Sequence, residues 1–421
     1  MAPWALPAVD RNGRLVLVAR ASRAFGFGLS SVALGLYLGE LGLPATETGL
    51  IFTAALLGTM LLTLVIALRG DRIGRRRLLI VGSLLMTLAV AIPLARGAPA
   101  VLVLIGLTGM IAVTANESTG LHSVDQAILP QTVADRDRTS VFALYSLVAF
   151  AATALGSAAL GPLVGLGELA GLTGPDRYAP AFLAYAATGL AAAFSAGRLD
   201  QMAEVGDRIE KGFAITRSRA VVARLSALFA IDSFAGGLVV QSFLAFVFAS
   251  RFGLSPGAVG ILFFAGSLAG AASFPVAARL ARRYGLIRTM VFTHIPSSLL
   301  LIGIALVPPD AVGAAVVASI LYLARALLSS MDVPTRQSYV MAVVDPSERT
   351  STAGVTSLAR SASQSLAPLI GGALLVPLGL AAPLVACGVL KITYDLLLFA
   401  AFRAHPAPDE MAAGTGSGAV V

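Results

Sequence analysis

The sequence has little charge, one cysteine and three histidines. Only 12% of its 421 residues are charged, against 57% that are hydrophobic, and a soluble domain would leave too much of that apolar surface in water. The lone cysteine, Cys387, excludes an intrachain disulfide and a thiolate metal site, and the histidines have no zinc-binding spacing. No G-x-x-x-x-G-K-[ST] phosphate loop is present, which argues against direct driving by ATP. We expect no cofactor and no metal.

A short cationic stretch, ALRGDRIGRRR at residues 67–77, lies between two long apolar runs at 51–68 and 78–94. Each run is long enough to cross a bilayer core of about 30 Å as a helix. Arginines do not cross a membrane readily, so this turn is expected on the cytoplasmic side.

Apolar segments separated by polar loops predict twelve membrane spans. They cover about 15–38, 46–68, 78–94, 101–129, 139–166, 179–195, 220–249, 257–280, 289–307, 311–343, 351–378 and 383–402. Arginines concentrate in alternate loops, which places both termini in the cytoplasm and explains the formal charge of +8 without nucleic acid. We predict an N-terminal six-helix bundle at 1–197, a cytoplasmic linker at 198–219, a C-terminal bundle at 220–403 and a disordered tail at 404–421.

The two halves of the chain resemble each other at a fixed offset. Residues that match 211 positions apart include Ala67 with Ala278, Gly74 with Gly285, Arg77 with Arg288, Gly42 with Gly253, Gln126 with Gln337 and Gly161 with Gly372. A single ungapped register indicates a duplication, and parallel repeats of this kind are typical of transporters.

Residues 67–77 resemble the signature between helices two and three of the major facilitator superfamily, G-x-x-x-D-[KR]-x-G-R-[KR]-[KR]. The matching residues are Asp71, Arg72, Gly74, Arg75, Arg76 and Arg77, with Ala67 in place of the first glycine. The resemblance implies an all-α membrane protein with twelve helices in two pseudo-symmetric six-helix bundles around a cavity that opens alternately to each side. A looser pattern at Gly156, Gly161, Pro162 and Gly165 resembles an element of proton-driven exporters, whose usual arginine motif in span four is absent.

The resemblance also implies a cytoplasmic latch. A carboxylate at Asp71 can accept hydrogen bonds from backbone N–H groups at the start of span eleven, residues 350–352. Asp125, at the inner end of span four, is then the expected partner of Arg75 or Arg76. The predicted gate comprises Asp71, Arg72, Gly74, Arg75, Arg76, Asp125 and Arg336. The alternative is that these arginines only hold the topology.

The second copy inverts two of these charges. At the offset of 211, Asp71 becomes Arg282 and Asp125 becomes Arg336. Charge matching within each half can survive this inversion if Asp332, Asp345 or Glu348 supplies the acid in the second half.

Ionisable side chains inside spans are costly, so each is a functional candidate. Glu117 and Asp232 lie deep, where a carboxylate can carry a proton, and His122 could relay protons or simply pack. The predicted substrate and proton pathway comprises Arg20, Arg23, Glu117, His122, Asp232, Arg325, Arg360 and Gln364. The excess of buried arginine favours an organic anion, unless the acids neutralise it.

The same charges could instead pair structurally between helices. Lys391 and Asp395, four residues apart in span twelve, are expected to form such a pair. His294, near Pro296 in span nine, is expected to have a structural role.

These features predict a monomeric secondary transporter of the cell membrane, not an enzyme. It is expected to move a small-molecule substrate by alternating access. Proton-coupled export is the favoured hypothesis. Protons and the lipid bilayer are the expected partners. An uptake carrier or exchanger for an organic anion is the alternative. A receptor or scaffold is a remote one, because the outer loops are too short to hold an extramembrane module.

Overall fold

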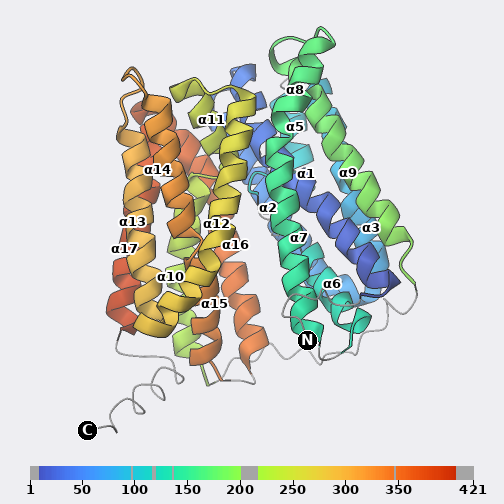
Figure 1. Ribbon diagram of the computed structural model, residues 1–421, viewed down its shortest axis with the longest axis vertical. Helices are drawn as coiled ribbons and strands as arrows, with labels where there is room; N and C mark the ends of the chain where they lie inside the picture. The colour runs from blue at the N-terminus through green and yellow to red at the C-terminus, as the bar shows by residue number, and fades with distance from the viewer. Residues whose placement is uncertain are drawn as a thin grey trace. The chain divides into compact units, whose positions relative to one another are not determined.

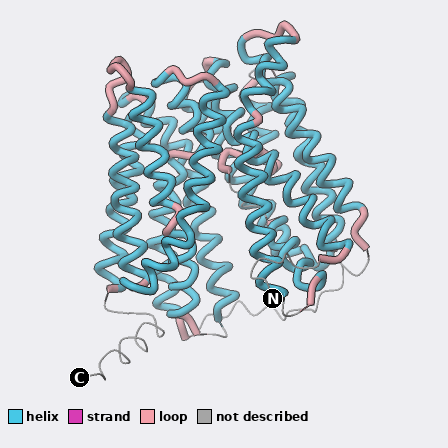
Figure 2. The backbone as a smooth tube through the Cα atoms, in the orientation of Figure 1, coloured by secondary structure: helices cyan, strands magenta, loops and turns pink. Residues whose placement is uncertain are grey.

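The computed structural model describes residues 9–95, 98–115, 120–134, 137–200, 217–345 and 348–403. These ranges are helical apart from their connecting loops, and no strand occurs in them (Figure 2). Glu117, the predicted tail at 404–421 and most of the predicted linker at 198–219 lie outside the described residues. Asp71 is described only through its helical backbone.

Contacts divide the described chain into two compact units. The first comprises residues 9–200 together with 240–265. Its helices are α1 (Arg11–Leu41), α2 (Ala45–Ile73), α3 (Arg75–Leu85), η1 (Met86–Val90), α4 (Ala91–Leu94), α5 (Pro99–Leu107), α6 (Leu121–Ile128), η2 (Leu129–Thr132), α7 (Arg138–Ala158), α8 (Leu160–Leu169), η4 (Gly174–Tyr178), α9 (Ala179–Gly197), α11 (Gln241–Phe252) and the beginning of α12 (Pro256–Tyr284). The long α1 packs against α7, α9 and α11 (Figure 1).

The second unit comprises residues 217–239 and 266–403. It contains α10 (Arg219–Leu238), the remainder of α12, α13 (Leu286–Leu306), α14 (Ala314–Ser329), α15 (Asp332–Val343), α16 (Arg349–Leu378) and α17 (Ala381–Phe402). α10 packs against α16 and α17, and α13 lies beside α14 and α17 (Figure 1). The division into two six-helix bundles joined at 198–219 stays a prediction from the repeat.

The duplicated register has a counterpart in the backbone. Gly74, between α2 and α3, has a φ of 93°, and Gly285, between α12 and α13, has a φ of 88°. Residues other than glycine avoid such positive φ values, because their Cβ would approach a neighbouring carbonyl oxygen too closely. Gly42 and Gly253, also 211 positions apart, end α1 and α11 with φ values of 66° and 68°. Equivalent turns thus follow equivalent helices in the two copies.

Eleven helical stretches among the described residues are long and apolar enough to cross a membrane. The chain is therefore an all-α, multi-pass membrane protein. The predicted fourth span at 101–129 is broken into α5 and α6, and residues 108–115 between them are not helical. Gly109, with a φ of 74°, lies in this break.

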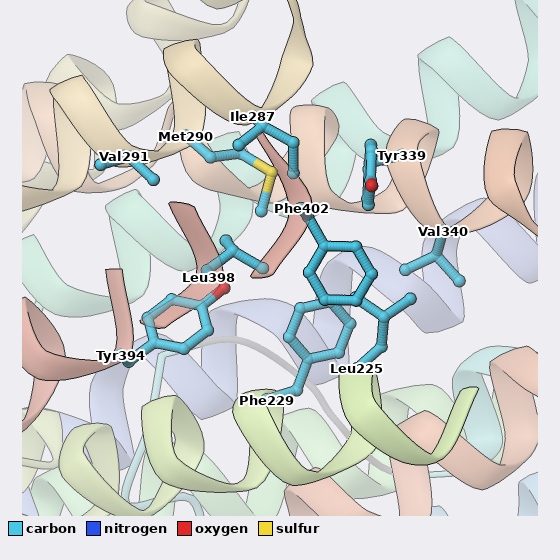
Figure 3. Packing of buried hydrophobic residues seen from close by; sticks show 10 residues of the cluster. All are labelled: Leu225, Phe229, Ile287, Met290, Val291, Tyr339, Val340, Tyr394, Leu398 and Phe402. Carbon is cyan, nitrogen blue, oxygen red and sulfur yellow. The ribbon is translucent and has the colours of Figure 1, made fainter. Parts of the chain in front are cut away.

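An apolar cluster joins four helices of the second unit (Figure 3). Residues three and four apart on α13 and on α17 each form one buried face, which is the helical period. The cluster contains Leu225, Phe229, Ile287, Met290, Val291, Tyr339, Val340, Tyr394, Leu398 and Phe402. Cys387 is also fully buried on α17. The opposite face of α13 is left outside this core, and Phe292 there is 65% exposed.

Candidate functional site

A buried ion pair forms the centre of the polar cluster in the first unit. The guanidinium of Arg23 on α1 contacts the carboxylate of Asp125 on α6, and both side chains are fully buried. The hydroxyl of Tyr145 on α7 donates to the same carboxylate oxygen at 2.9 Å. A buried charge is tolerated only when it is paired and hydrogen-bonded. Three helices are thus tied together through one acid.

Tyr145 extends this cluster to two further predicted pathway residues. The guanidinium carbon of Arg20 lies 5.0 Å from the centre of the Tyr145 ring, a cation–π contact. His122 Nδ1 lies 2.9 Å from the Tyr145 hydroxyl oxygen. The structure therefore brings Arg20, Arg23 and His122 together, as expected for one site. The described members carry two guanidiniums and one carboxylate.

The expected contact between Asp125 and the basic turn is wrong. Arg75 Nη1 instead lies 3.5 Å from the carbonyl oxygen of Ala127, and Arg76 donates to the carbonyl of Gly197. Asp125 lies on the buried face of α6, so its carboxylate is directed toward α1 rather than toward the guanidiniums of Arg75 and Arg76. The turn contacts the backbone next to Asp125 and leaves the acid itself to Arg23.

The structure leaves the predicted latch untested. Arg72 is exposed in the last turn of α2, and Gly74 makes the sharp turn into α3. The side chains of Asp71 and of Thr350, at the start of α16, lie outside the described part of the chain. The latch therefore remains a prediction from the family resemblance.

Asp232 on α10 is the centre of a second polar cluster, in the second unit. Lys391 Nζ on α17 lies 2.6 Å from its Oδ1, and Arg336 Nη1 on α15 lies 3.4 Å from its Oδ2. His294 Nε2 on α13 lies 4.0 Å from Oδ1. All four side chains are at most 12% exposed. One deeply buried carboxylate thus faces two fixed cations and an imidazole.

Two more acids complete this cluster. Arg336 also forms an ion pair with Asp332, one turn earlier on α15. His294 Nδ1 lies 3.0 Å from both carboxylate oxygens of Asp395 on α17. The imidazole therefore stands between two buried carboxylates, Asp395 on one ring nitrogen and Asp232 near the other.

One expectation for this cluster is wrong. Lys391 and Asp395 do not pair with each other in the structure, because Lys391 bonds to Asp232 while Asp395 bonds to His294. Their shared helix face packs against α10 and α13, which offer closer partners. His294, which was expected to be structural, contacts Asp395 and is part of the charged network.

The remaining predicted pathway residues lie at the margin of the cluster or outside it. Arg360 Nε on α16 donates to Ser233 Oγ at 3.0 Å, next to Asp232. Arg325 on α14 and Gln364 on α16 are half-buried, and the structure shows neither bonded to Asp232. Tyr145, Lys391 and Asp395 are cluster members that the sequence did not assign to the pathway. The signal for the last two was their charge within span twelve.

A separate polar contact joins α1 and α11 within the first unit. Ser242 Oγ donates to the carbonyl of Ser31 at 2.7 Å, and its backbone N–H donates to the carbonyl of Val113 at 3.1 Å. Gln241 Nε2 donates to Ser31 Oγ at 3.0 Å. A Cβ at Gly35 would overlap the backbone oxygen of Ser242. The absence of a side chain at Gly35 therefore permits this close approach.

Membrane-length helices, an internal repeat and buried charge clusters define a polytopic carrier. The sequence profile of the Major Facilitator Superfamily matches residues 16–368. The chain belongs to this family and is a transporter of its type.

Known proteins resemble this chain along most of its length. An uncharacterized membrane protein of Saccharomyces cerevisiae, YJR124C, is 24% identical, with 93% of this chain and 94% of that protein covered. The nucleoside transporter NupG has a similar fold, with a TM-score of 0.74, 11% identity and coverage of 94% of this chain and 99% of that chain. A D-xylose–proton symporter aligns with a TM-score of 0.69, 11% identity and coverage of 94% and 98%, respectively. At such low identity these two structures show the fold alone.

Proposed function

We propose that the chain is a proton-coupled exporter of small organic molecules, working by alternating access in the cell membrane as a monomer with cytoplasmic termini. One observation carries the proposal: Asp232 is buried between Lys391 and Arg336 and beside His294, which in turn contacts Asp395. Carboxylates and imidazoles exchange protons, and few other groups in a membrane interior can do so.

Competition at Asp232 would couple substrate to proton. A proton on Asp232 removes the negative charge that Lys391 and Arg336 neutralise, whereas a substrate donating hydrogen bonds favours the ionised carboxylate. At a pH where Asp232 is protonated, substrate binding releases its proton, and substrate departure allows one to return. His294, 4.0 Å from Asp232 and 3.0 Å from Asp395, gives the proton a second acceptor.

The glycine pattern of span five supports the export direction. A Cβ at Gly156 would overlap the carbonyl of Phe25 on α1, and one at Gly161 would press on Gly257. Gly156 and Gly161 both belong to the glycine pattern that resembles an element of proton-driven exporters. A D-xylose–proton symporter among the structural neighbours supports proton coupling in this fold, without favouring a direction.

We assign the gates as follows. Asp71, Arg72, Gly74, Arg75 and Arg76 stay the proposed cytoplasmic latch. Asp125 and Arg336 were predicted from the sequence to belong to this gate, but each is a member of one of the two buried charge clusters. The contact of Ser242 with Ser31 is the proposed gate of the opposite side, which must separate for that side to open.

Proton release on substrate addition tests the proposal. Purified protein in weakly buffered detergent solution, with a pH-sensitive dye, is titrated with candidate compounds. Asp232→Asn should abolish proton release, while Asp200→Asn, at an exposed acid, should retain it. If Asp232→Asn releases protons as the unmodified chain does, Asp232 is not the coupling site. Glu117→Gln is measured beside it, because Glu117 is the other predicted carrier.

A carrier for an organic anion is the second candidate. The described members of the first cluster hold two guanidiniums and one carboxylate, and guanidiniums bind carboxylates and phosphates. Here protonation of Asp232 would leave Lys391 and Arg336 available to the anion, so binding would take up a proton. The sign of the proton signal therefore separates the two functions. Arg20→Gln should weaken the binding of an anionic substrate more than the binding of its neutral analogue.

A further inference from the structure

A pocket of about 610 Å³ opens on the second unit, and its lining includes no residue of the charged network around Asp232. It lies between the end of α12, the beginning of α13 and α17. Its lining includes Leu280, Arg288, Thr289, Phe292, Thr293 and Phe399. On α13 they follow the spacing 288, 289, 292, 293, which is the helix face opposite Ile287, Met290 and Val291 of the apolar cluster.

The walls of this pocket are apolar. Phe292 and Phe399 stand edge to face with ring centres 6.0 Å apart. The hydroxyl of Thr289 donates to the carbonyl of Gly285 at 2.8 Å, and that of Thr293 donates to the carbonyl of Thr289 at 2.8 Å. Both hydroxyls are therefore satisfied by their own helix and present mainly methyl groups. A hydrophilic solute would find almost no hydrogen-bond partner here.

The rim of the pocket is cationic. Arg288 is exposed and has no acidic partner among the described residues. Arg283 lies over the ring of Tyr284 at 5.2 Å, and Arg403 over the ring of Phe399 at 6.0 Å. Three guanidiniums thus lie next to an apolar pocket on helices of membrane length. The matching ligand has a hydrocarbon chain and an anionic head.

We propose that this pocket binds an anionic phospholipid. Its acyl chain lies against Phe292 and Phe399, and its phosphate pairs with Arg288 at the membrane surface. Basic pockets between membrane helices bind anionic head groups in this way. The position favours a lipid over a soluble anion, because Phe292 is 65% exposed on a membrane-length helix and would meet acyl chains.

Brominated lipids test this assignment in nanodiscs. The only native tryptophan is Trp4, so Trp4→Phe provides a background without tryptophan. Phe292→Trp then reports contact with the pocket, and Ile320→Trp reports contact with bulk lipid, since Ile320 is 60% exposed on α14. Quenching is compared for brominated phosphatidylglycerol and brominated phosphatidylcholine at equal mole fractions.

Tryptophan at 292 should prefer phosphatidylglycerol by about fivefold, as one arginine near an anionic lipid provides. Adding Arg288→Gln should remove the preference, and tryptophan at 320 should show none in either background. Equal quenching by both lipids at 292 would overturn the proposal. So would an absence of quenching at 292 with normal quenching at 320, because protein, such as a second copy, would then cover the pocket.

Discussion

Asp125 and Arg336 hold equivalent positions 211 residues apart, carry opposite charges, and each contacts the first helix of its own repeat. Asp125 pairs with Arg23 on α1, and Arg336 lies 3.4 Å from Asp232 on α10. The duplicated chain has therefore kept a buried charge pair at this place while reversing its direction. The charge inversion predicted from the sequence is thus compensated, because each residue has an oppositely charged partner within its own unit.

Breaking the pair in the first unit should strongly destabilise the protein. Asp125→Ala removes the carboxylate that pairs with the buried guanidinium of Arg23, and breaking a buried ion pair costs about 3–5 kcal/mol. The double variant Arg23→Leu with Asp125→Leu should recover much of that loss but not transport. Thermal unfolding in detergent measures both. Asp200→Ala, which removes an exposed pair with Arg11, should cost less than about 1 kcal/mol and is the control.

Removing the cation nearest Asp232 should change the pH dependence of coupling. Lys391→Met takes away the ammonium at 2.6 Å, and an opposite charge this close favours the ionised carboxylate. The pH midpoint of substrate-induced proton release should rise accordingly. Lys391→Arg keeps the charge and should keep the midpoint. An unchanged midpoint in Lys391→Met would remove Asp232 from the coupling mechanism.

Two glycines of α1 should differ in their tolerance of a methyl group. A Cβ at Gly35 meets the backbone oxygen of Ser242, whereas one at Gly39 meets the ring of Phe246, which can move. We expect Gly35→Ala to destabilise the protein by about 1–3 kcal/mol and Gly39→Ala by less. Thermal unfolding and transport assays on both variants decide the point. Equal effects would mean that the backbone of α11 at Ser242 moves as readily as the ring of Phe246.

The two repeat turns should respond alike to alanine. Gly74→Ala and Gly285→Ala place a Cβ on a backbone with φ values of 93° and 88° and an extended ψ, a conformation nearly exclusive to glycine, at a cost of about 1–3 kcal/mol each. Gly165 is helical with open space around it, so Gly165→Ala should stabilise the protein by up to about 1 kcal/mol. Unfolding temperatures that fall for all three variants would contradict this reading.

Most of the fold could be predicted, because membrane spans depend on length and hydrophobicity alone. The break in span four was missed, since a run of suitable length does not reveal whether Gly109 turns the chain out of the helix. The repeat was visible because Gly74 and Gly285 keep the same backbone requirement. The pairing of charged residues on different helices left no comparable pattern in the sequence.

The site was predicted only in part. Buried charges identify themselves by their cost in a membrane, which is why Arg23 and Asp232 were found. Their partners depend on which helix faces are adjacent. Lys391 has Asp395 four residues away but bonds to Asp232 on another helix, and sequence spacing reports only neighbours on the same helix. Tyr145 carries no charge and gave no signal.

Cys387 is the only cysteine of the chain and is completely enclosed within α17's packing. A water-soluble maleimide therefore meets no native thiol on the folded protein. Any cysteine introduced elsewhere becomes a unique labelling position without prior removal of a core residue. Solvent access along α1 and α11 during turnover can accordingly be followed on an otherwise unaltered chain.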